Sequence, residues 1–238
     1  MRIPRVLISQ SLQEGQTLEL PKPAAHHLQK VLRLRKGHPV LVFDGNGAEF
    51  EGELLDQSRV RLALPTGREP ESPLFLTLIQ GISRGQKMDF ALQKAVELGV
   101  AAIQPVACER SVVQLEGERL EKRLAHWRGV IESACEQSGR TRVPELLPPT
   151  KLFELDACSE GDGYYLDPEG ANSLATCVIA SSVSLIVGPE GGLSKGETQY
   201  LRSVAYRGVR LGPRVLRTET AGIAALAVLQ ALKGDFCD

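Results

Sequence analysis

Two apolar segments in the last third of the chain, each leading into a turn of glycine and proline, place the strongest constraint on the fold. Residues 185–192 read LIVGPEGG, and residues 211–221 read LGPRVLRTETA. Each pattern is that of a buried strand, an exposed turn and the start of a helix. Two such turns, separated by one short helix, can bind a small ligand through bare backbone groups. This arrangement favours a binding site in the last third of the chain.

The composition is that of an ordinary globular protein, but the charge is unevenly distributed. The 238 residues are 42% hydrophobic and 24% charged, enough for one large domain or two small ones. The formal net charge of −1 does not by itself indicate a nucleic-acid partner. Residues 1–68, however, hold ten Lys and Arg against seven Asp and Glu, with no acidic residue from Ala24 to Phe43. The basic side chains of this stretch form either a solvated helix face or a phosphate-contacting patch. They are Lys30, Arg33, Arg35 and Lys36.

Several classes of protein are disfavoured by the cysteine, histidine and apolar patterns. The five cysteines are widely spaced and never form Cys-x-x-Cys, which favours free thiols over disulfides or a zinc site. None of the four histidines lies in a His-Glu-x-x-His arrangement, so no metal is expected. The longest apolar run, residues 221–229, is shorter than the ~20 residues of a membrane span. No apolar signal segment is found near the N-terminus, and we expect a cytoplasmic protein without a membrane partner.

Local patterns predict a small, mostly β domain at the N-terminus. Strands are expected over residues 39–43, 49–55 and 59–64, with a hairpin turn at 44–47. A short helix is expected over residues 24–34, with Leu28, Val31 and Leu32 on one face. The three prolines of residues 65–73 indicate a linker, so the first domain is predicted to be a barrel of residues 1–68.

From residue 74 onward the patterns of strands and helices alternate, which predicts a parallel sheet covered by helices. Strands are expected over residues 74–79, 101–106, 164–166 and 183–187. Helices are expected over residues 88–98 and 120–135, with Gly99 and Gly139 as stop signals.

Two further helices are predicted around the glycine turns. Ser194 and Glu197 form a capping box for a helix between the two turns. The last helix, residues 218–233, is apolar nearly all round, and such a helix is usually enclosed in a core or a subunit interface.

The first glycine turn does not match the common nucleotide-binding motifs. Gly188–Gly192 is not Gly-x-Gly-x-x-Gly, no acidic residue about 20 positions on could hold a ribose, and no Gly-Lys-Ser/Thr follows. On this motif alone, a tight turn without a ligand remains an open alternative. The second glycine turn favours a pocket, because ligand sites in open α/β sheets gather at the carboxyl ends of strands.

These motifs carry a resemblance to a known family. LIVGPEGGLSKGE (185–197) and RLGPRVLRTETAGIAAL (210–226) resemble the cofactor motifs of the SPOUT methyltransferases. QGISRGQKMDFALQKAVELGV (80–100), ERSVV (109–113) and ACEQSGRTRVPEL (134–146) narrow the resemblance to the 16S rRNA (uracil(1498)-N(3))-methyltransferases. HHLQKVLRLRKGHPVLVFDGNGAEFEG (26–52) is similar to the PUA-like domain of that family.

The resemblance implies both architecture and activity. It implies a PUA-like RNA-binding β-barrel at residues 1–68 and an α/β SPOUT domain at residues 74–238. A deep trefoil knot is implied at about residues 160–238, although knots are rare in proteins generally. The implied reaction is transfer of a methyl group from S-adenosyl-L-methionine to uridine N3 in 16S rRNA of the 30S ribosomal subunit. The resemblance also implies a homodimer, because the family forms homodimers with the active site at the subunit interface.

The same resemblance implies a cofactor site on three loops. By position these are the strand end at Leu166, the first glycine turn and the stretch that begins at Leu211. Glycines suit such a site because a ligand there approaches main-chain groups closely. The residues implied to bind the cofactor are Leu166, Val187, Gly188, Pro189, Glu190, Gly191, Gly192, Leu211, Gly212, Leu216, Arg217, Thr220 and Ala221.

Three residues are candidates for a catalytic role. Uracil N3 carries a proton and is a poor nucleophile until that proton leaves, so the reaction needs a base, positive charge near the uracil oxygens, or both. Arg217 could stabilise the developing charge, and Glu219 or Glu190 is the nearest candidate base. Glu219 could instead be an acid that favours a helix N-terminus, and Glu190 could merely orient its loop.

Scattered basic residues are candidates for contacts with RNA phosphates. Individually they could be ordinary surface charges, but together they suit binding that weakens as salt rises. The predicted RNA-binding residues are Arg5, His27, Arg33, Arg35, Arg84, Lys87, Arg110 and Arg140. Lys94 and Arg142 belong to the same basic cluster, whereas Trp127 is expected in the core.

Two rival functions remain open from the residues alone. The first is another SPOUT activity, such as methylation of a ribose 2′-hydroxyl. The second is a non-catalytic RNA-binding factor for ribosome assembly, which would not bind the cofactor.

Overall fold

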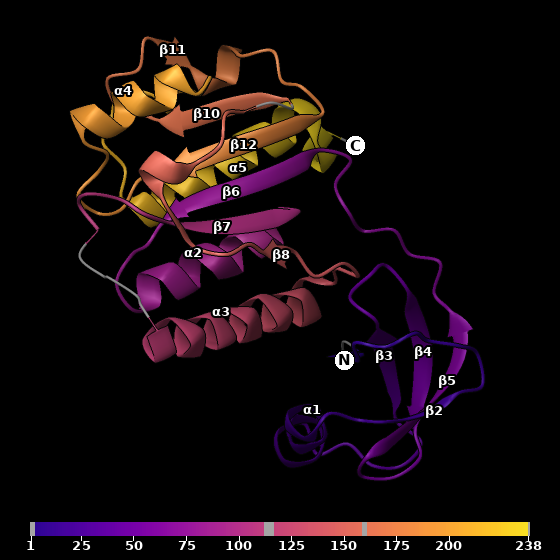
Figure 1. Cartoon of the computed structure of the whole chain (residues 1–238). Coiled ribbons are helices and arrows are strands. Elements are labelled where there is room, and N and C mark those ends of the chain that lie inside the picture. The colour runs from indigo at the N-terminus through magenta and orange to yellow at the C-terminus, as the bar shows by residue number, and fades with distance from the viewer. Residues whose placement is uncertain (1–2, 112–116, 159–160, 238) are drawn as a thin grey trace. The chain divides into compact units, whose positions relative to one another are not determined.

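The computed structural model describes residues 3–111, 117–158 and 161–237. Val112 and Val113 of the ERSVV motif lie outside the described residues. The chain divides into two compact units (Figure 1). The first contains the chain up to Glu71 together with Glu132–Val143, and the second contains Ser72–Ile131 and the chain from Pro144 onward. Residues 132–143, which follow the predicted linker, therefore group with the N-terminal unit.

The first unit is a curled five-stranded sheet in the order β1-β3-β4-β5-β2. Its strands are β1 (Arg5–Leu7), β2 (Thr17–Glu19), β3 (Pro39–Phe43), β4 (Glu49–Leu54) and β5 (Arg59–Pro65). The pair β1–β3 is parallel and the other pairs are antiparallel. The predictions for β3, β4 and β5 are confirmed, whereas β1 and β2 are too short to show a pattern in the sequence.

The predicted helix of residues 24–34 is shorter and begins earlier. It consists of α1 (Lys22–His26) and one π-helical turn, η1 (His27–Val31). Arg33, two residues beyond the end of this turn, has a φ of 55°, in the left-handed region. Leu28 is buried in the core of the unit with Val6, Val40 and Val60, whereas Val31 and Leu32 are exposed.

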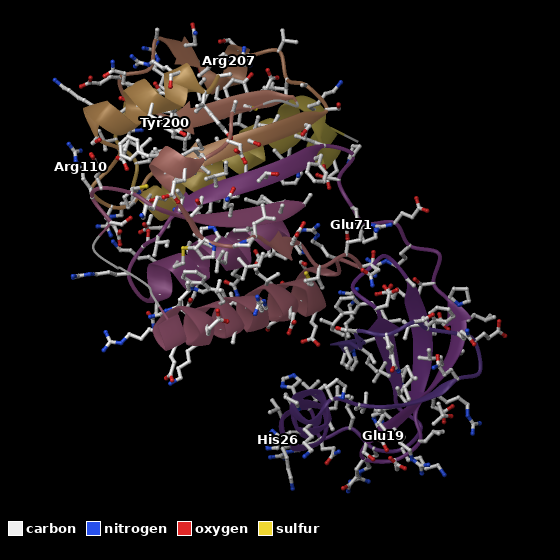
Figure 2. All side chains as sticks on the ribbon, viewed as in Figure 1. Glu19, His26, Glu71, Arg110, Tyr200 and Arg207 are labelled. Atoms are coloured by element: carbon white, nitrogen blue, oxygen red, sulfur yellow. The ribbon has the colours of Figure 1, made fainter. Side chains whose placement is uncertain are left out.

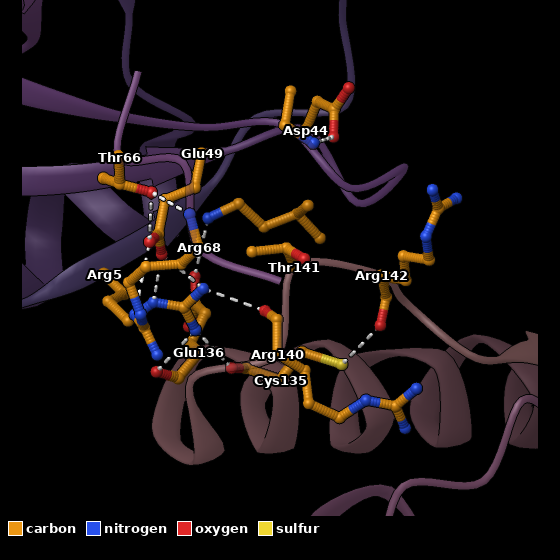
Figure 3. Close-up of polar contacts among 12 residues, drawn as sticks. Arg5, Asp44, Glu49, Thr66, Arg68, Cys135, Glu136, Arg140, Thr141 and Arg142 are labelled. Atoms are coloured by element: carbon orange, nitrogen blue, oxygen red, sulfur yellow. Dashed lines mark hydrogen bonds and ion pairs between the residues drawn. The ribbon is translucent and has the colours of Figure 1, made fainter. Parts of the chain in front are cut away.

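A buried polar network joins residues 132–143 to the β-sheet of the first unit (Figure 3). The Arg5 guanidinium pairs with Glu49 at 2.7 Å and donates hydrogen bonds to the carbonyl oxygens of Cys135 and Arg140. Arg140 pairs with Glu71 at 2.6 Å. Buried polar groups are stable only when paired, and these contacts supply the pairing.

The second unit contains a parallel sheet in the order β11-β13-β10-β12-β6-β7-β8, with β9 beside β7. Its strands are β6 (Phe75–Gly81), β7 (Ala102–Ala107), β8 (Glu145–Leu146), β9 (Thr150–Lys151), β10 (Asp162–Leu166), β11 (Asn172–Ser173), β12 (Ser182–Val187) and β13 (Arg207–Arg210). The four strands predicted from residue 74 onward are confirmed to within two residues at each end. The sequence pattern missed the short strands β8, β9, β11 and β13.

Helices cover both faces of this sheet, because successive side chains of a strand point to opposite faces. On one face α4 (Lys195–Ser203) and η2 (Leu152–Glu154) pack over Ile79 and Ile186. On the other face α5 (Thr218–Lys233) lies against Val187 and packs with α2 (Gln86–Glu97) (Figure 1).

The remaining helical segments are α3 (Gly117–Ser138), η3 (Leu174–Thr176) and η4 (Asp235–Cys237). Trp127 of α3 is buried as expected. The capping box of α4 is confirmed, since Ser194 and Glu197 exchange hydrogen bonds at 3.0 and 2.7 Å.

The final helix is less enclosed than its sequence predicts. Ala225, Leu226 and Leu229 of α5 are buried, but Ile223 and Val228 are half-buried. One apolar side of the helix therefore stays accessible in the single chain. In the described part of the chain, no helix combines the length and apolarity that crossing a bilayer requires.

Candidate functional site

The carboxyl ends of three neighbouring strands form a pocket of about 460 Å³ in the second unit. β10 lies between β12 and β13, all three are parallel, and their carboxyl ends therefore open at the same edge. The lining residues are Lys87, Leu166, Asp167, Pro168, Val187, Gly188, Pro189, Glu190, Gly191, Gly192, Leu193, Val209, Arg210, Leu211, Gly212, Arg214, Val215, Leu216, Arg217, Thr218, Glu219 and Ala221. The two glycine turns, 20 and more residues apart in the chain, thus meet at one site.

The first glycine turn is held closely against the end of β6. A Cβ atom at Gly81 would lie 2.5 Å from the backbone nitrogen of Pro189, so only glycine fits there. The turn closes on itself because the N–H of Gly192, at φ 68°, donates to the carbonyl oxygen of Pro189 at 2.8 Å. The Thr218 hydroxyl donates to the Gly188 carbonyl at 2.5 Å and ties the turn to the start of α5.

A second attachment of the turn comes from Arg110, which follows β7 (Figure 2). Its guanidinium donates to the carbonyl oxygens of Gly191 and Leu193 at 3.0 and 3.3 Å. The buried Glu197 carboxylate accepts from the backbone N–H of Glu109 at 2.8 Å, which holds the chain beside Arg110. In this structure Arg110 therefore positions the turn.

Glu190 is held by basic and backbone groups at the rim of the pocket. Its carboxylate accepts from the backbone N–H of Arg84 at 3.3 Å and lies 3.5 Å from Lys87 Nζ. Partial burial opposes ionisation, but hydrogen bonds from the backbone of Glu190 and Arg84 and the charge of Lys87 outweigh it. The pKa of Glu190 is therefore below its ordinary value, and this carboxylate is a weak proton acceptor.

The second turn brings the start of α5 to the pocket. Glu219, in the first turn of this helix, contributes a carboxylate oxygen, Oε2, that is buried and has no hydrogen-bond partner among the described residues. An unpartnered buried acceptor is costly and commonly marks a place for a ligand or a water. Arg217, which precedes the helix, is exposed on the same pocket.

Of the predicted cofactor and catalytic residues, Thr220 is the exception to this grouping. It is exposed and lies outside the pocket lining, whereas Glu219 and Ala221 line the pocket. Its neighbour Thr218, which the sequence analysis missed, lines the pocket instead. Its place as the first residue of the last helix, directly before Glu219, was the signal that could have singled out Thr218.

The structure places Arg5 and Arg140, two of the predicted RNA-binding residues, in the interior of the first unit and disfavours that role. Both side chains are buried, 3% and 8% exposed respectively, and both serve the polar network of the first unit. The Arg5 guanidinium also lies 4.4 Å above the Phe43 ring. Neither residue can reach a phosphate without breaking these contacts.

The other predicted RNA-binding residues are exposed. They are His27, Arg33, Arg35, Arg84, Lys87 and Arg110. Lys87 pairs with Glu190, and Arg110 donates to the Gly191 carbonyl. Arg33 has a left-handed backbone conformation. Within the described residues, no cluster of three or more His, Cys, Asp or Glu side chains could hold a metal ion.

Comparison with known proteins shows which family the chain belongs to. Residues 70–230 match the RNA methyltransferase domain, and residues 20–61 match the RNA methyltransferase PUA domain. The chain is 34% identical to ribosomal RNA small subunit methyltransferase E of Buchnera aphidicola from Schizaphis graminum, over 98% of both chains. It belongs to the ribosomal RNA small subunit methyltransferase E family. The family resemblance read from the motifs is thereby confirmed.

Solved structures of this methyltransferase family agree with the fold. The protein is similar to ribosomal RNA small subunit methyltransferase E from Neisseria gonorrhoeae bound to S-adenosyl methionine, with 42% identity and a TM-score of 0.93 over 99% and 100% of the two chains. It is also similar to a Legionella pneumophila methyltransferase in complex with S-adenosyl methionine, with 38% identity and a TM-score of 0.91 over the same shares. The predicted class, a SPOUT-type α/β unit with a PUA-like unit, is confirmed.

Proposed function

We propose that this protein transfers a methyl group from S-adenosylmethionine to N3 of a uridine in 16S rRNA of the small ribosomal subunit. The observation that carries the proposal is the pocket at the carboxyl ends of β10, β12 and β13. It contains both glycine turns, in a chain whose relatives from Neisseria and Legionella hold this methyl donor. The N3 position and the nucleotide rest on the family resemblance of the motifs.

The pocket suits S-adenosylmethionine in size and chemistry. Its volume lies within the range of about 300–1,000 Å³ that is typical of small-molecule sites. Gly192 and Gly212 have positive φ angles, and no heavy atom lies within 4 Å of the place where a Cβ would be. Main-chain groups there are open to a ligand.

The residues of the three loops hold and orient the cofactor in this proposal. Leu166, Val187, Leu211, Leu216 and Ala221 supply apolar walls, and Gly188–Gly192 supplies main-chain groups. When bound, S-adenosylmethionine supplies a methyl group activated by a sulfonium. Methyl transfer is a single displacement, so the contribution of the protein is chiefly positioning.

Glu219 is the residue proposed to accept the N3 proton, because it lines the pocket and its buried Oε2 has no hydrogen-bond partner among the described residues. Glu190 is the weaker candidate, since its lowered pKa and its contacts with Arg84 and Lys87 make it a loop-orienting group. Arg217 lies beside Glu219 in the chain and is proposed to stabilise negative charge on the uracil oxygens.

The rest of the proposal concerns assembly and location. We propose a homodimer in which the partner covers the accessible apolar side of α5 and the exposed Leu232 and Phe236 nearby.

We also propose the trefoil knot at about residues 160–238. The strand order supports it, because the chain passes from β12 over β10 to reach β13. A substrate in the ribosomal subunit implies action in the cytoplasm.

The function is tested by incubating the protein with labelled S-adenosylmethionine and either 30S particles or naked 16S rRNA, followed by nucleoside analysis. We expect 3-methyluridine. A methyl group on a ribose would support 2′-O-methylation instead. Absence of both label transfer and cofactor binding by calorimetry would support the non-catalytic alternative and contradict the proposal.

The first unit is proposed to bind RNA through Arg33 and Arg35, which are exposed in a stretch without acids. The double variant Arg33→Ala/Arg35→Ala is expected to reduce the slope of log affinity against log salt by about 1.5, as two lost phosphate contacts predict. Filter binding to 16S rRNA at several salt concentrations measures this slope.

A matched control removes the same charge elsewhere. Arg119 and Lys122 are exposed residues of α3, and Arg119→Ala/Lys122→Ala should leave the slope unchanged. An equal slope in wild type and Arg33→Ala/Arg35→Ala would remove this stretch from the RNA interface.

A further inference from the structure

Gln80 is a buried polar residue at the end of β6, outside the lining of the pocket. Its side chain is 1% exposed, and its Nε2 donates to the Gly81 carbonyl at 3.0 Å and to Thr218 Oγ1 at 3.4 Å. Thr218 in turn donates its hydroxyl proton to the Gly188 carbonyl at 2.5 Å. The result is a chain of hydrogen bonds from β6, through the first residue of α5, to the first residue of the glycine turn.

The strand and the turn meet without room for a further side chain, and the helix packs against them at ordinary van der Waals distance. Gly81 faces the backbone of Gly188 and Pro189, where an added Cβ would lie within 2.8 Å of both. A Cβ at Gly222 of α5 would lie 3.6 Å from Val187 and 3.8 Å from Gln80 Oε1. Strand, turn and helix therefore meet at one junction, and Gln80 and Thr218 supply its side-chain hydrogen bonds.

The direction of this hydrogen-bond chain follows from its chemistry. A threonine hydroxyl has one proton, and Thr218 gives that proton to the Gly188 carbonyl. The Gln80 amide is a donor, so it satisfies the hydroxyl oxygen without competing for the proton. A carboxylate at position 80 would compete for it, because an ionised carboxylate only accepts.

We propose that Gln80 and Thr218 are positioning residues, which hold the Gly188–Gly192 turn at the start of α5 and thereby set the affinity of the pocket for S-adenosylmethionine. The inference rests on the proposed function. Thr218 directly precedes Glu219, so the same junction also places the free Glu219 oxygen relative to the turn. Neither Gln80 nor Thr218 is needed for the chemistry itself.

Three variants test this assignment. Thr218→Val keeps the shape and removes the donor, Thr218→Ser keeps the hydroxyl, and Gln80→Glu reverses the polarity at nearly constant shape. Thr198→Val is the matched control, because Thr198 of α4 also donates its hydroxyl to a backbone carbonyl, that of Lys195 at 3.1 Å, but outside the pocket.

The measurement is the dissociation constant of S-adenosylmethionine, determined by calorimetry on the full chain without RNA. We expect Thr218→Val and Gln80→Glu to bind about tenfold more weakly, the size of one lost buried hydrogen bond. Thr218→Ser should stay within about twofold of wild type, and Thr198→Val should be unchanged. The double variant Gln80→Leu/Thr218→Val should be no weaker than Thr218→Val, because both act on one chain of bonds.

Circular dichroism and thermal unfolding establish that each variant is folded. If Thr218→Val is unfolded, the comparison of Gln80→Glu with wild type tests the inference in its place. Equal affinity of wild type and Thr218→Val, or a Thr218→Ser variant as weak as Thr218→Val, would overturn the inference. If wild type itself does not bind S-adenosylmethionine, the proposed function fails, whatever the variants do.

Discussion

Replacing Glu219 by glutamine is expected to lower the rate of methyl transfer by about 10²–10⁴-fold, the usual contribution of a positioned general base. The substitution keeps the shape of the side chain and removes its capacity to take a proton. The basis of this expectation is that Glu219 lines the pocket and that its buried Oε2 has no hydrogen-bond partner among the described residues. The measurement is the single-turnover rate with saturating S-adenosylmethionine and bound 30S particles.

Two companion variants separate the roles at the site. Glu190→Gln should affect cofactor affinity more than the single-turnover rate, because Glu190 is held by Arg84 and Lys87 at the rim. Arg217→Ala should lower the single-turnover rate if the guanidinium stabilises charge on uracil. A Glu219→Gln variant with the wild-type rate would show that Glu219 is only a helix N-terminal acid.

Replacing Arg5 by methionine is expected to lower the free energy of unfolding by about 3–5 kcal/mol, the usual cost of removing one partner of a buried ion pair. The Arg5 and Glu49 side chains are 3% and 0% exposed, so the variant leaves a carboxylate buried without its principal partner. The carbonyl oxygens of Cys135 and Arg140 also lose their donors. Urea denaturation of the full chain, followed by a probe in each unit, measures the loss.

A matched control uses the second cation of the same carboxylate. Arg68 pairs with Glu49 at 3.2 Å, but its side chain is 48% exposed. Arg68→Met should therefore cost less than about 1 kcal/mol. The double variant Arg5→Met/Glu49→Met should be more stable than Arg5→Met, because no buried charge is left unpaired. An Arg5→Met variant within 1 kcal/mol of wild type would contradict the assigned role of the network.

The predictions made from local patterns are the ones the structure confirms. The β3–β4 hairpin, the capping box of Ser194 and Glu197, and the extent of α5 depend on residues near one another in the chain. Parallel strands were also predictable, because apolar runs alternate with helical spacing. The convergence of the two glycine turns followed once those strands were assumed to be neighbours.

Other expectations failed where contacts between residues far apart in the chain decide whether a side chain is buried or exposed. Arg5 and Arg140 look like surface cations in the sequence, yet Arg5 meets the Cys135 carbonyl across 130 positions of chain. Thr218 and Thr220 are equivalent in composition, and only the direction each faces on α5 separates pocket from surface.

The amino-acid sequence alone determined the family, the longer strands and helices, and the two turns that line the candidate site. These depend on spacing, turn chemistry and capping, which act over a few residues. Only the tertiary structure decided that residues 132–143 join the first unit and that Gln80 and Thr218 support the glycine turn. Such pairings depend on which strands become neighbours, and an unpaired buried polar group is costly enough to require them.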